Sequence, residues 1–158
     1  MEDPVSGVKV ILLYGVLPEL DIITRSVCVK NESNGKIYLN KVESASLDFL
    51  YGDYDLLTFY GRHAMERKMQ RVPVAHGTQK IGSVRGTSSH QYNPMMILAE
   101  KDATEDAGSC YAMSFVYSGC FQGEVLKDQL NQTRMMLGLQ EEYFRYPLEQ
   151  GEMFRAPE

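Results

Sequence analysis

The stretch YAMSFVYSGCFQGEVLKDQLNQTRMMLGL, residues 111–139, carries the pattern that decides the fold class. Large side chains between residues 109 and 117 alternate with smaller ones, and four would share one face of a strand: Tyr111, Met113, Phe115 and Tyr117. The Ser118-Gly119 pair predicts a turn. Two further β-rich runs follow at 121–126 and 134–139. This alternation indicates consecutive β-strands joined by turns.

Apolar runs upstream of this stretch continue the pattern. Val8–Tyr14 is rich in β-branched residues and predicts a buried strand, and Leu20–Lys30 predicts a second strand. The turn Asn31–Gly35 ends in Asn-Gly, so we expect a hairpin that pairs Leu20–Lys30 with Lys36–Leu47. Helix is the competing prediction for Lys36–Leu47, but its β-branched, serine and asparagine residues weaken that alternative.

The middle of the chain is less clear. Leu56–Tyr60 predicts a strand after a loop over 48–55. Gly61–Val72 has methionines at 65 and 69, a spacing that would suit one face of a helix. Gly61 and Pro73 bound this segment closely, which favours an extended or irregular structure.

The whole pattern predicts a single all-β domain. Further strands are expected at Pro94–Leu98, Tyr143–Leu148 and Met153–Phe154, with a charged loop over 100–108. Short turns rich in Gly, Asn, Ser and Asp separate the strands, and no helical period is sustained. We therefore expect a β-sandwich of antiparallel sheets with little helix.

Composition narrows the functional classes. The 158 residues carry a net charge of −5, which argues against a nucleic-acid or membrane-surface partner because no basic face is available. No apolar run approaches the roughly 20 residues of a membrane span, and the N-terminal residues do not resemble a signal peptide. Cys28, Cys110 and Cys120 lack CxxC spacing, so we expect free thiols in a reducing compartment, the cytoplasm.

Candidate catalytic groups are sparse. The carboxylate pairs Asp53/Asp55 and Glu105/Asp106 lie in loops where acidic residues commonly form turns. The three histidines do not accompany a GxSxG nucleophile motif, and they do not group with the cysteines at zinc-ligand spacing. Gly82–Gly86 lacks the lysine of a phosphate-binding loop. The sequence therefore predicts no catalytic residue, no metal and no cofactor.

The stretch His76–Pro94, HGTQKIGSVRGTSSHQYNP, is unusually polar and rich in glycine. Its hydroxyls, amides and histidines could satisfy sugar hydroxyls, or they could hold the turns of a structured loop. Ten tyrosines could likewise be core residues or could stack on sugar rings.

Seven segments together resemble successive motifs of the family-36 glycoside hydrolases, the α-galactosidases, in the order and spacing of that family. They cover nearly the whole chain: LDIITRSV (20–27), SASLDF (44–49), DYDLLTFYGRHAMER (53–67), HGTQKIGSVRGTSSHQYNP (76–94), YAMSFVYSGCFQGEV (111–125), DQLNQTRMMLGL (128–139) and LEQGEMFRAPE (148–158).

This resemblance implies that residues 1–158 form part of an N-terminal β-supersandwich domain, and that the chain starts within that domain. The family's catalytic aspartates lie on a (β/α)₈ barrel, which we expect to lie outside this chain and to be its packing partner. The implied substrates of the full enzyme are terminal α-galactosides of the melibiose and raffinose type. The family also implies a homo-oligomer, a tetramer in which a neighbouring N-terminal domain helps to close the galactoside pocket.

The resemblance also suggests residues at the rim of that pocket or at an interface. The segment GRHAMER (61–67) is the expected contributor, with His63 standing where many relatives carry a Trp that could stack on a sugar. The complete set of candidates is Tyr54, Arg62, His63, Arg85, His90, Gln91 and Asn93.

Two further expectations remain open. A stand-alone carbohydrate-binding module would use Tyr51, Tyr54 and Tyr92 beside the polar loops. Uncovered sheet edges and apolar patches would favour association of the isolated chain into dimers or larger forms.

Overall fold

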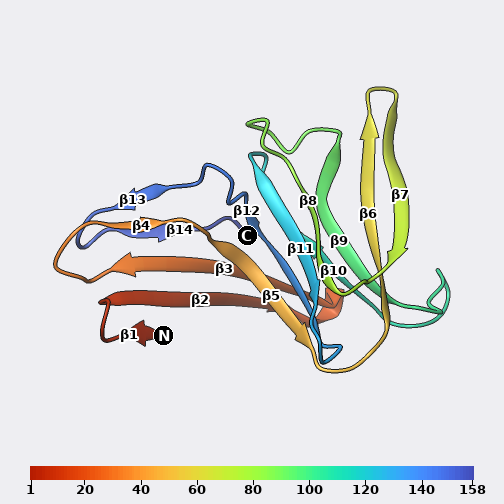
Figure 1. Cartoon of the computed structure of the whole chain (residues 1–158), viewed down its shortest axis with the longest axis horizontal. Helices are drawn as coiled ribbons and strands as arrows, with labels where there is room; N and C mark the ends of the chain where they lie inside the picture. The colour runs from red at the N-terminus through yellow and green to blue at the C-terminus, as the bar shows by residue number, and fades with distance from the viewer.

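The computed structural model describes residues 1–158 as fourteen strands with one three-residue 3₁₀ helix, so the predicted all-β class is confirmed (Figure 1). All strand pairs are antiparallel. No helical segment has the length and apolar character needed to cross a membrane.

Two four-stranded sheets form the sandwich. The first has the order β5-β12-β11-β8, and its strands span Glu43–Phe49, Thr133–Leu139, Phe121–Lys127 and Gly77–Gly82. The second has the order β10-β9-β6-β7, and its strands span Cys110–Ser114, Tyr92–Glu100, Tyr54–Arg62 and Met65–Pro73. The opening stretch of sequence thus supplies β10, β11 and β12.

The core lies between these two sheets. Its fully buried large side chains come from β9, β11 and β12: Met96, Leu98, Phe121, Val125 and Met135. Each contributes about 1.5–3 kcal/mol by leaving water. A Cβ at Gly123 would lie 2.7 Å from the sulfur of Met96, so this glycine allows the sheets to approach closely.

A third sheet, in the order β1-β2-β3-β14, extends the structure to one side of β5 (Figure 1). Its strands span Glu2–Asp3, Val8–Leu17, Ile22–Asn31 and Met153–Arg155, and the 3₁₀ helix η1, Pro18–Leu20, joins β2 to β3. Two serines fasten the chain's C-terminal residues to it and to β5. Ser26 Oγ donates to Ala156 O at 3.0 Å, and Ser44 Oγ donates to Pro157 O at 2.6 Å.

The predicted hairpin between Leu20–Lys30 and Lys36–Leu47 is wrong. β3 pairs with β2 and β14, whereas the next strand, β4 (Ile37–Leu39), pairs with β13 (Tyr146–Leu148) in a separate ribbon. The buried side chain of Asn31 explains the departure. Its amide donates to Gly35 O at 2.7 Å and to Leu148 O at 2.9 Å, and this directs the chain away from β3.

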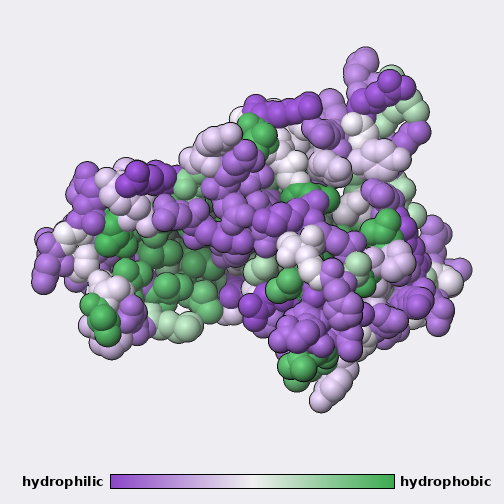
Figure 2. Space-filling view, viewed as in Figure 1, coloured by the Kyte–Doolittle hydropathy of each residue, from purple (hydrophilic) through white to green (hydrophobic).

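The exposure of β2 also differs from the prediction. None of its residues is buried, because no second sheet covers it as the β9 sheet covers β11. Large apolar side chains of β2 and β3 are exposed: Leu13, Tyr14, Val16, Leu17, Ile22 and Ile23. Hydrophobic residues gather over the region of β2, β3 and β14 in Figure 2.

The preference for an extended Gly61–Val72 is confirmed. β6 and β7 form a hairpin around a two-residue turn, His63–Ala64, and Leu56 lies opposite Val72. Every residue of β7 except Val72 is exposed, and the strand carries the basic residues Arg67, Lys68 and Arg71. Charge of this kind is a common feature of an uncovered edge strand.

Candidate functional site

Two polar loops lie side by side at one end of the sandwich. They are the β6–β7 turn and the β8–β9 loop, residues 83–91, which both lie at the top of Figure 1. The Gly61 N–H donates to Gln91 O at 3.3 Å and links them directly. We call this region the loop end. It holds six of the seven predicted site residues: Arg62, His63, Arg85, His90, Gln91 and Asn93.

The β6–β7 turn presents its polar side chains to solvent. Ala64 takes a left-handed conformation with φ of 61°, and its N–H donates to Glu66 Oε1 at 2.9 Å. The guanidinium of Arg62 lies 3.1 Å from the sulfur of Met65. His63 is exposed, and its ring makes no hydrogen bond within the chain, so it is free to contact another molecule.

The β8–β9 loop is held by a serine side chain and by backbone N–H groups rather than by its candidate site residues. Ser83 Oγ donates to Thr87 O at 2.6 Å, and the Gly86 N–H points at Cys120 Sγ at 3.1 Å. Ser88 N–H donates to Ser118 O at 2.9 Å. The side chains of Arg85, His90, Gln91 and Asn93 make no hydrogen bond or ion pair within the chain.

Tyr54 does not join the other candidates. It begins β6 whereas Arg62 ends it, so the two residues lie about 26 Å apart along an extended strand. Tyr54 is buried, its ring packs against Phe49 and Tyr111, and its hydroxyl donates to Tyr51 O at 3.1 Å. Burial raises the pKa of Tyr54. These contacts make Tyr54 a packing residue of the core.

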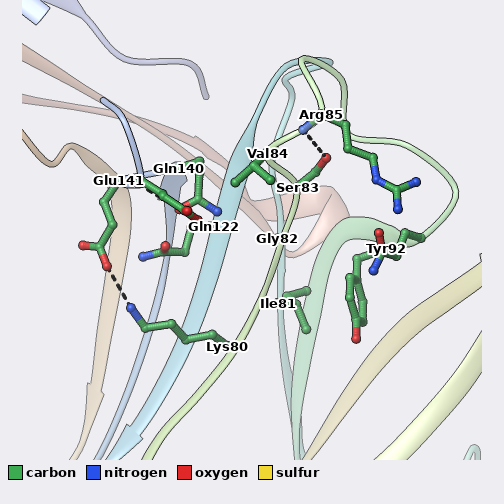
Figure 3. Close-up of a pocket in the computed structure, with 12 residues that line it drawn as sticks. Lys80, Ile81, Gly82, Ser83, Val84, Arg85, Tyr92, Gln122, Gln140 and Glu141 are labelled. Carbon is green, nitrogen blue, oxygen red and sulfur yellow. Dashed lines mark hydrogen bonds and ion pairs between the residues drawn. The ribbon is translucent and has the colours of Figure 1, made fainter. Parts of the chain in front are cut away.

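A polar hollow of about 600 Å³ opens at the end of β8 (Figure 3). Figure 3 shows Gln122, Gln140 and Glu141 on one side of the β8 ribbon and Arg85 with Tyr92 on the other. The remaining lining residues are Lys80, Ile81, Gly82, Ser83, Val84, Gln91 and Glu142. The hollow thus combines three amide side chains, one tyrosine, two cationic side chains and two anionic side chains.

Two lysines and three glutamates form an ion-pair network beside this hollow. Lys80 Nζ lies 2.7 Å from Glu124 Oε1 and 2.8 Å from Glu141 Oε1. Lys41 Nζ lies 3.2–3.3 Å from carboxylate oxygens of Glu43, Glu124 and Glu141. Glu124 retains only 6% of its side-chain exposure, and a buried carboxylate needs such partners.

Two glutamates of this network have pKa values shifted in opposite directions. Hydrogen bonds from Lys80 and then Lys41 lower the pKa of Glu141 to about 2. Burial raises the pKa of Glu43, although Lys41 lies beside it. Hydrogen bonding to the two glutamates raises the pKa of Lys80. Because each carboxylate already has a lysine partner, the network is suited to holding β8, β11 and β5 together.

The two carboxylate pairs named from the sequence behave differently: Asp53 and Asp55 form ion pairs, whereas Glu105 and Asp106 are exposed. Asp55 Oδ2 accepts a hydrogen bond from Arg71 Nε at 2.7 Å, and Arg71 also donates to backbone carbonyls of the 100–103 loop. Asp53 lies 3.2 Å from Lys127 Nζ. Glu105 and Asp106 are exposed in the β9–β10 loop. No group of His, Cys, Asp and Glu is arranged to hold a metal ion.

Sequence reasoning missed Gln122, Gln140, Glu141 and Glu142 as lining residues of the hollow. They come from β11 and from the segment after β12, which the sequence separates from β8 by about forty to sixty residues. The alternation in β11 could have signalled Gln122 and Glu124, since both are polar residues between apolar ones within a predicted strand.

Comparisons with known proteins agree with this architecture. Residues 1–149 match the glycosyl hydrolase family 36 N-terminal domain. The bifunctional alpha-galactosidase/sucrose kinase AgaSK of Mediterraneibacter gnavus is 60% identical over all 158 residues, which span 17% of that protein. Alpha-galactosidase Mel36A of Lactobacillus acidophilus is 38% identical over the whole chain, which spans 22% of its length.

Solved structures show the same fold. The α-galactosidase AgaA of Geobacillus stearothermophilus superposes with a TM-score of 0.96 at 36% identity, over 99% of this chain and 22% of that protein. Variants of AgaA have been crystallised with stachyose and with raffinose. The chain therefore spans about a fifth of the relatives that it matches. The agreement in sequence along residues 1–149 and in fold means that this chain belongs to the N-terminal domain family of the family-36 glycosyl hydrolases.

Proposed function

We propose that this chain is the N-terminal β-domain segment of a retaining α-galactosidase that acts on terminal α-galactosides of the melibiose and raffinose type. Its role is to support the catalytic barrel, to contribute to an oligomer interface and to form part of the pocket rim. The family match over residues 1–149 carries this proposal. The oligosaccharides bound by AgaA support the choice of substrate class.

The arrangement of the acidic residues supports a non-catalytic role for this segment. A retaining glycosidase needs two carboxyl groups about 5–5.5 Å apart that both face the sugar. Here Asp55 is bound to Arg71, and Glu43, Glu124 and Glu141 are bound to lysines. Such pairing keeps these carboxylates from acting as a nucleophile and a general acid.

An activity measurement tests this assignment. The 158-residue chain on its own should release no nitrophenol from nitrophenyl α-galactoside. A longer protein that carries this segment together with its catalytic barrel should release it readily. Hydrolysis by the 158-residue chain, at a rate proportional to its concentration after repeated purification, would overturn the proposal.

We infer that the pocket rim includes the loop end. The support is a group of polar side chains at one end of the sandwich that form no ion pair within the chain and are all exposed except the half-buried Asn93: Arg62, His63, Arg85, His90, Gln91 and Asn93. In the longer enzyme, His63→Ala and Arg62→Ala should raise the KM for raffinose and leave kcat nearly unchanged, because the loss concerns binding rather than the chemical step. Unchanged KM values in both variants would remove these residues from the rim.

We also infer that the exposed apolar side chains of β2 and β3 form a contact surface, either with the catalytic barrel or with a second copy. Contiguous apolar surface is usually covered in the assembled protein. The exposure of Val16 and Ile23, which lie opposite each other in the register, supports this view. The isolated chain is therefore expected to self-associate as its concentration rises.

The cytoplasm is the proposed location. Cys28 is buried, Cys110 is exposed and Cys120 is half-buried, and none of them forms a disulfide. An exposed free thiol is compatible with a reducing compartment. Fractionation of the source cells, with detection by an antibody against this chain, tests the location.

A further inference from the structure

A second hollow adjoins the polar hollow. It has a volume of about 560 Å³, and most of its lining is apolar. Its aromatic residues are Tyr117, Tyr143, Phe144, Tyr146 and Phe154. Val84, Gln140 and Glu142 line both hollows, so the two adjoin each other past the tip of β8, and we call them together the groove. One half of this groove is aromatic, and the other half carries amides and charged side chains of both signs.

We propose that this groove binds a neutral oligosaccharide that ends in α-linked galactose. The aromatic half would stack on the galactose ring, and the amide half would bind the hydroxyls of the following sugars. The choice of galactose rests on the proposed function; the rest of the inference comes from the groove itself.

The unsatisfied polar groups of the groove fit sugar hydroxyls. The guanidinium of Arg85, the amide of Gln91 and the hydroxyl of Tyr92 make no hydrogen bond within the chain. Gln140 Oε1 accepts from the Glu142 N–H at 3.1 Å, which leaves its NH₂ group as a donor. A guanidinium can donate to several hydroxyls at once, and an amide can both donate and accept.

The charges of the polar half argue for a neutral ligand. Its lining holds two cationic residues, Lys80 and Arg85, and two anionic residues, Glu141 and Glu142. Lys80 and Glu141 form an ion pair at 2.8 Å, so their charges already compensate each other. An anionic or cationic ligand would therefore meet little net opposite charge.

Tyr143 gives the aromatic half a feature that packing does not explain. Its side chain is 90% exposed, and its backbone is left-handed with φ of 65°. A bulky residue is uncommon in this conformation, and glycine or asparagine would be favoured there. The strain holds an exposed ring at the mouth of the hollow without any compensating contact in the core, as in many ligand-binding segments.

Galactose has an apolar face that suits stacking on an aromatic ring such as that of Tyr143. Its axial 4-hydroxyl leaves the C–H groups of C3, C4 and C5 together on one face, and this apolar face stacks on aromatic side chains. The volume of each hollow lies within the range of small-ligand sites, and together they could hold a trisaccharide. Raffinose is therefore the natural probe.

Calorimetric titration of the 158-residue chain with raffinose tests the proposal. Tyr143→Gly separates a binding role from a structural one, because glycine relieves the left-handed strain while removing the ring. We expect Tyr143→Gly to weaken raffinose binding about tenfold while the unfolding midpoint stays equal or rises. Arg85→Ala should weaken binding by about the same factor. Tyr51→Ala is the matched control, since Tyr51 is 86% exposed and lies outside both hollows, and it should bind as the unchanged chain does.

The outcomes are decisive. No heat of binding with raffinose up to roughly 50 mM would overturn the proposal. Equal affinity in the Tyr143→Gly and Arg85→Ala variants would also overturn it, because binding would then occur elsewhere. Maltotriose, a glucose trisaccharide, should bind at least about tenfold more weakly, and equal affinity would overturn the choice of galactose. These results do not depend on whether the longer enzyme cleaves α-galactosides, so the inference and the proposed function can fail separately.

Discussion

The hairpins β11–β12 and β2–β3 are both apolar and antiparallel, yet they have opposite environments. β11–β12 lies between the β9 sheet and the ion-pair network, and the first five residues of β11, including the polar Gln122 and Glu124, are all buried. In β2–β3 no residue of β2 is buried and only the second half of β3 is, at 26–29 and Asn31; near η1 both strands expose large apolar side chains. Apolar composition alone therefore does not make a strand a core strand; the covering layer does.

The largest expected effect is the loss of the interior packing. Phe121→Ala should reduce the free energy of unfolding by about 3–5 kcal/mol, because it opens a cavity in a fully buried position. Val16→Ala, in the exposed half of β2, should cost less than about 0.5 kcal/mol. Urea denaturation of both variants gives the two values. Similar losses in both variants would contradict the difference between the hairpins.

The sequence predicts the hairpin β11–β12, the interior hairpin, better than the hairpin β2–β3, the outer hairpin. Alternation at 109–117 and the apolar runs at 121–126 and 134–139 are local signals, and the structure confirms a strand at each, although β10 ends at Ser114. The wrong hairpin partner of β3 has a remote cause. Asn31 binds Leu148 O, 117 residues away, and no local pattern records this contact.

The site shows the same division between local and remote signals. The polar stretch 76–94 is recognisable because its glycines and hydroxyls lie close together in the sequence, and it supplies eight lining residues of the polar hollow. The prediction of Tyr54 as a rim residue rests on the family resemblance and on its position in the same segment as GRHAMER, but packing on Phe49 and Tyr111 buries it. Gln122, Gln140 and Glu141 enter the hollow only when β11 and the segment after β12 meet β8.

The outer hairpin should depend strongly on a few buried polar contacts. Asn31 is fully buried at the end of β3, and its side chain makes four hydrogen bonds, to Gly35 O, Leu148 O and both the N–H and Oγ of Ser33. Asn31→Ala should lower the free energy of unfolding by about 2–3 kcal/mol, since buried carbonyls lose their donors. Asn34→Ala is the matched control in the same turn, because Asn34 is exposed and makes no side-chain hydrogen bond.

Hydrogen exchange locates the effect of Asn31→Ala. Amides of β3, β4 and β13 should lose protection, whereas those of β11 and β12 should keep theirs in proportion to the global stability. A uniform loss across all strands would show that the outer hairpin is not a separate unit, and it would weaken the comparison.

The ion-pair network predicts a smaller effect that depends on pH. Lysines hold the pKa of Glu141 at about 2 in the folded chain, below the ordinary value of 4.5. The folded state therefore binds the proton less tightly, so the stabilisation is complete above about pH 4.5 and is lost as the pH falls toward 2. Its size is about 1 kcal/mol, because the side chain is partly exposed and water screens the pair.

Glu141→Gln should remove this dependence. Unfolding free energies measured between about pH 5 and 2.5 should fall less steeply in Glu141→Gln than in the unchanged chain. Glu142→Gln is the control, since the neighbouring glutamate forms no ion pair. Equal slopes in the Glu141→Gln and unchanged chains would mean that the network does not stabilise the packing of β8, β11 and β5.

The smallest effect on stability is expected where the outer hairpin is most exposed. Val16 and Ile23 lie directly opposite each other and are 65% and 68% exposed. The double change Val16→Thr and Ile23→Thr keeps β-branched side chains and should alter the free energy of unfolding by less than about 0.5 kcal/mol. It should nevertheless reduce self-association, because it removes apolar surface from the contact.

Sedimentation velocity over a range of concentrations measures this effect. The unchanged chain should shift to larger species as its concentration rises, and the double variant should remain smaller at each concentration. Val116→Thr, an exposed valine after β10, is the control and should associate like the unchanged chain. A double variant that associates as strongly as the unchanged chain would remove the β2–β3 surface from the interface. Such a result would favour association through the uncovered edge of β7, where backbone N–H and C=O groups remain available for pairing with another strand.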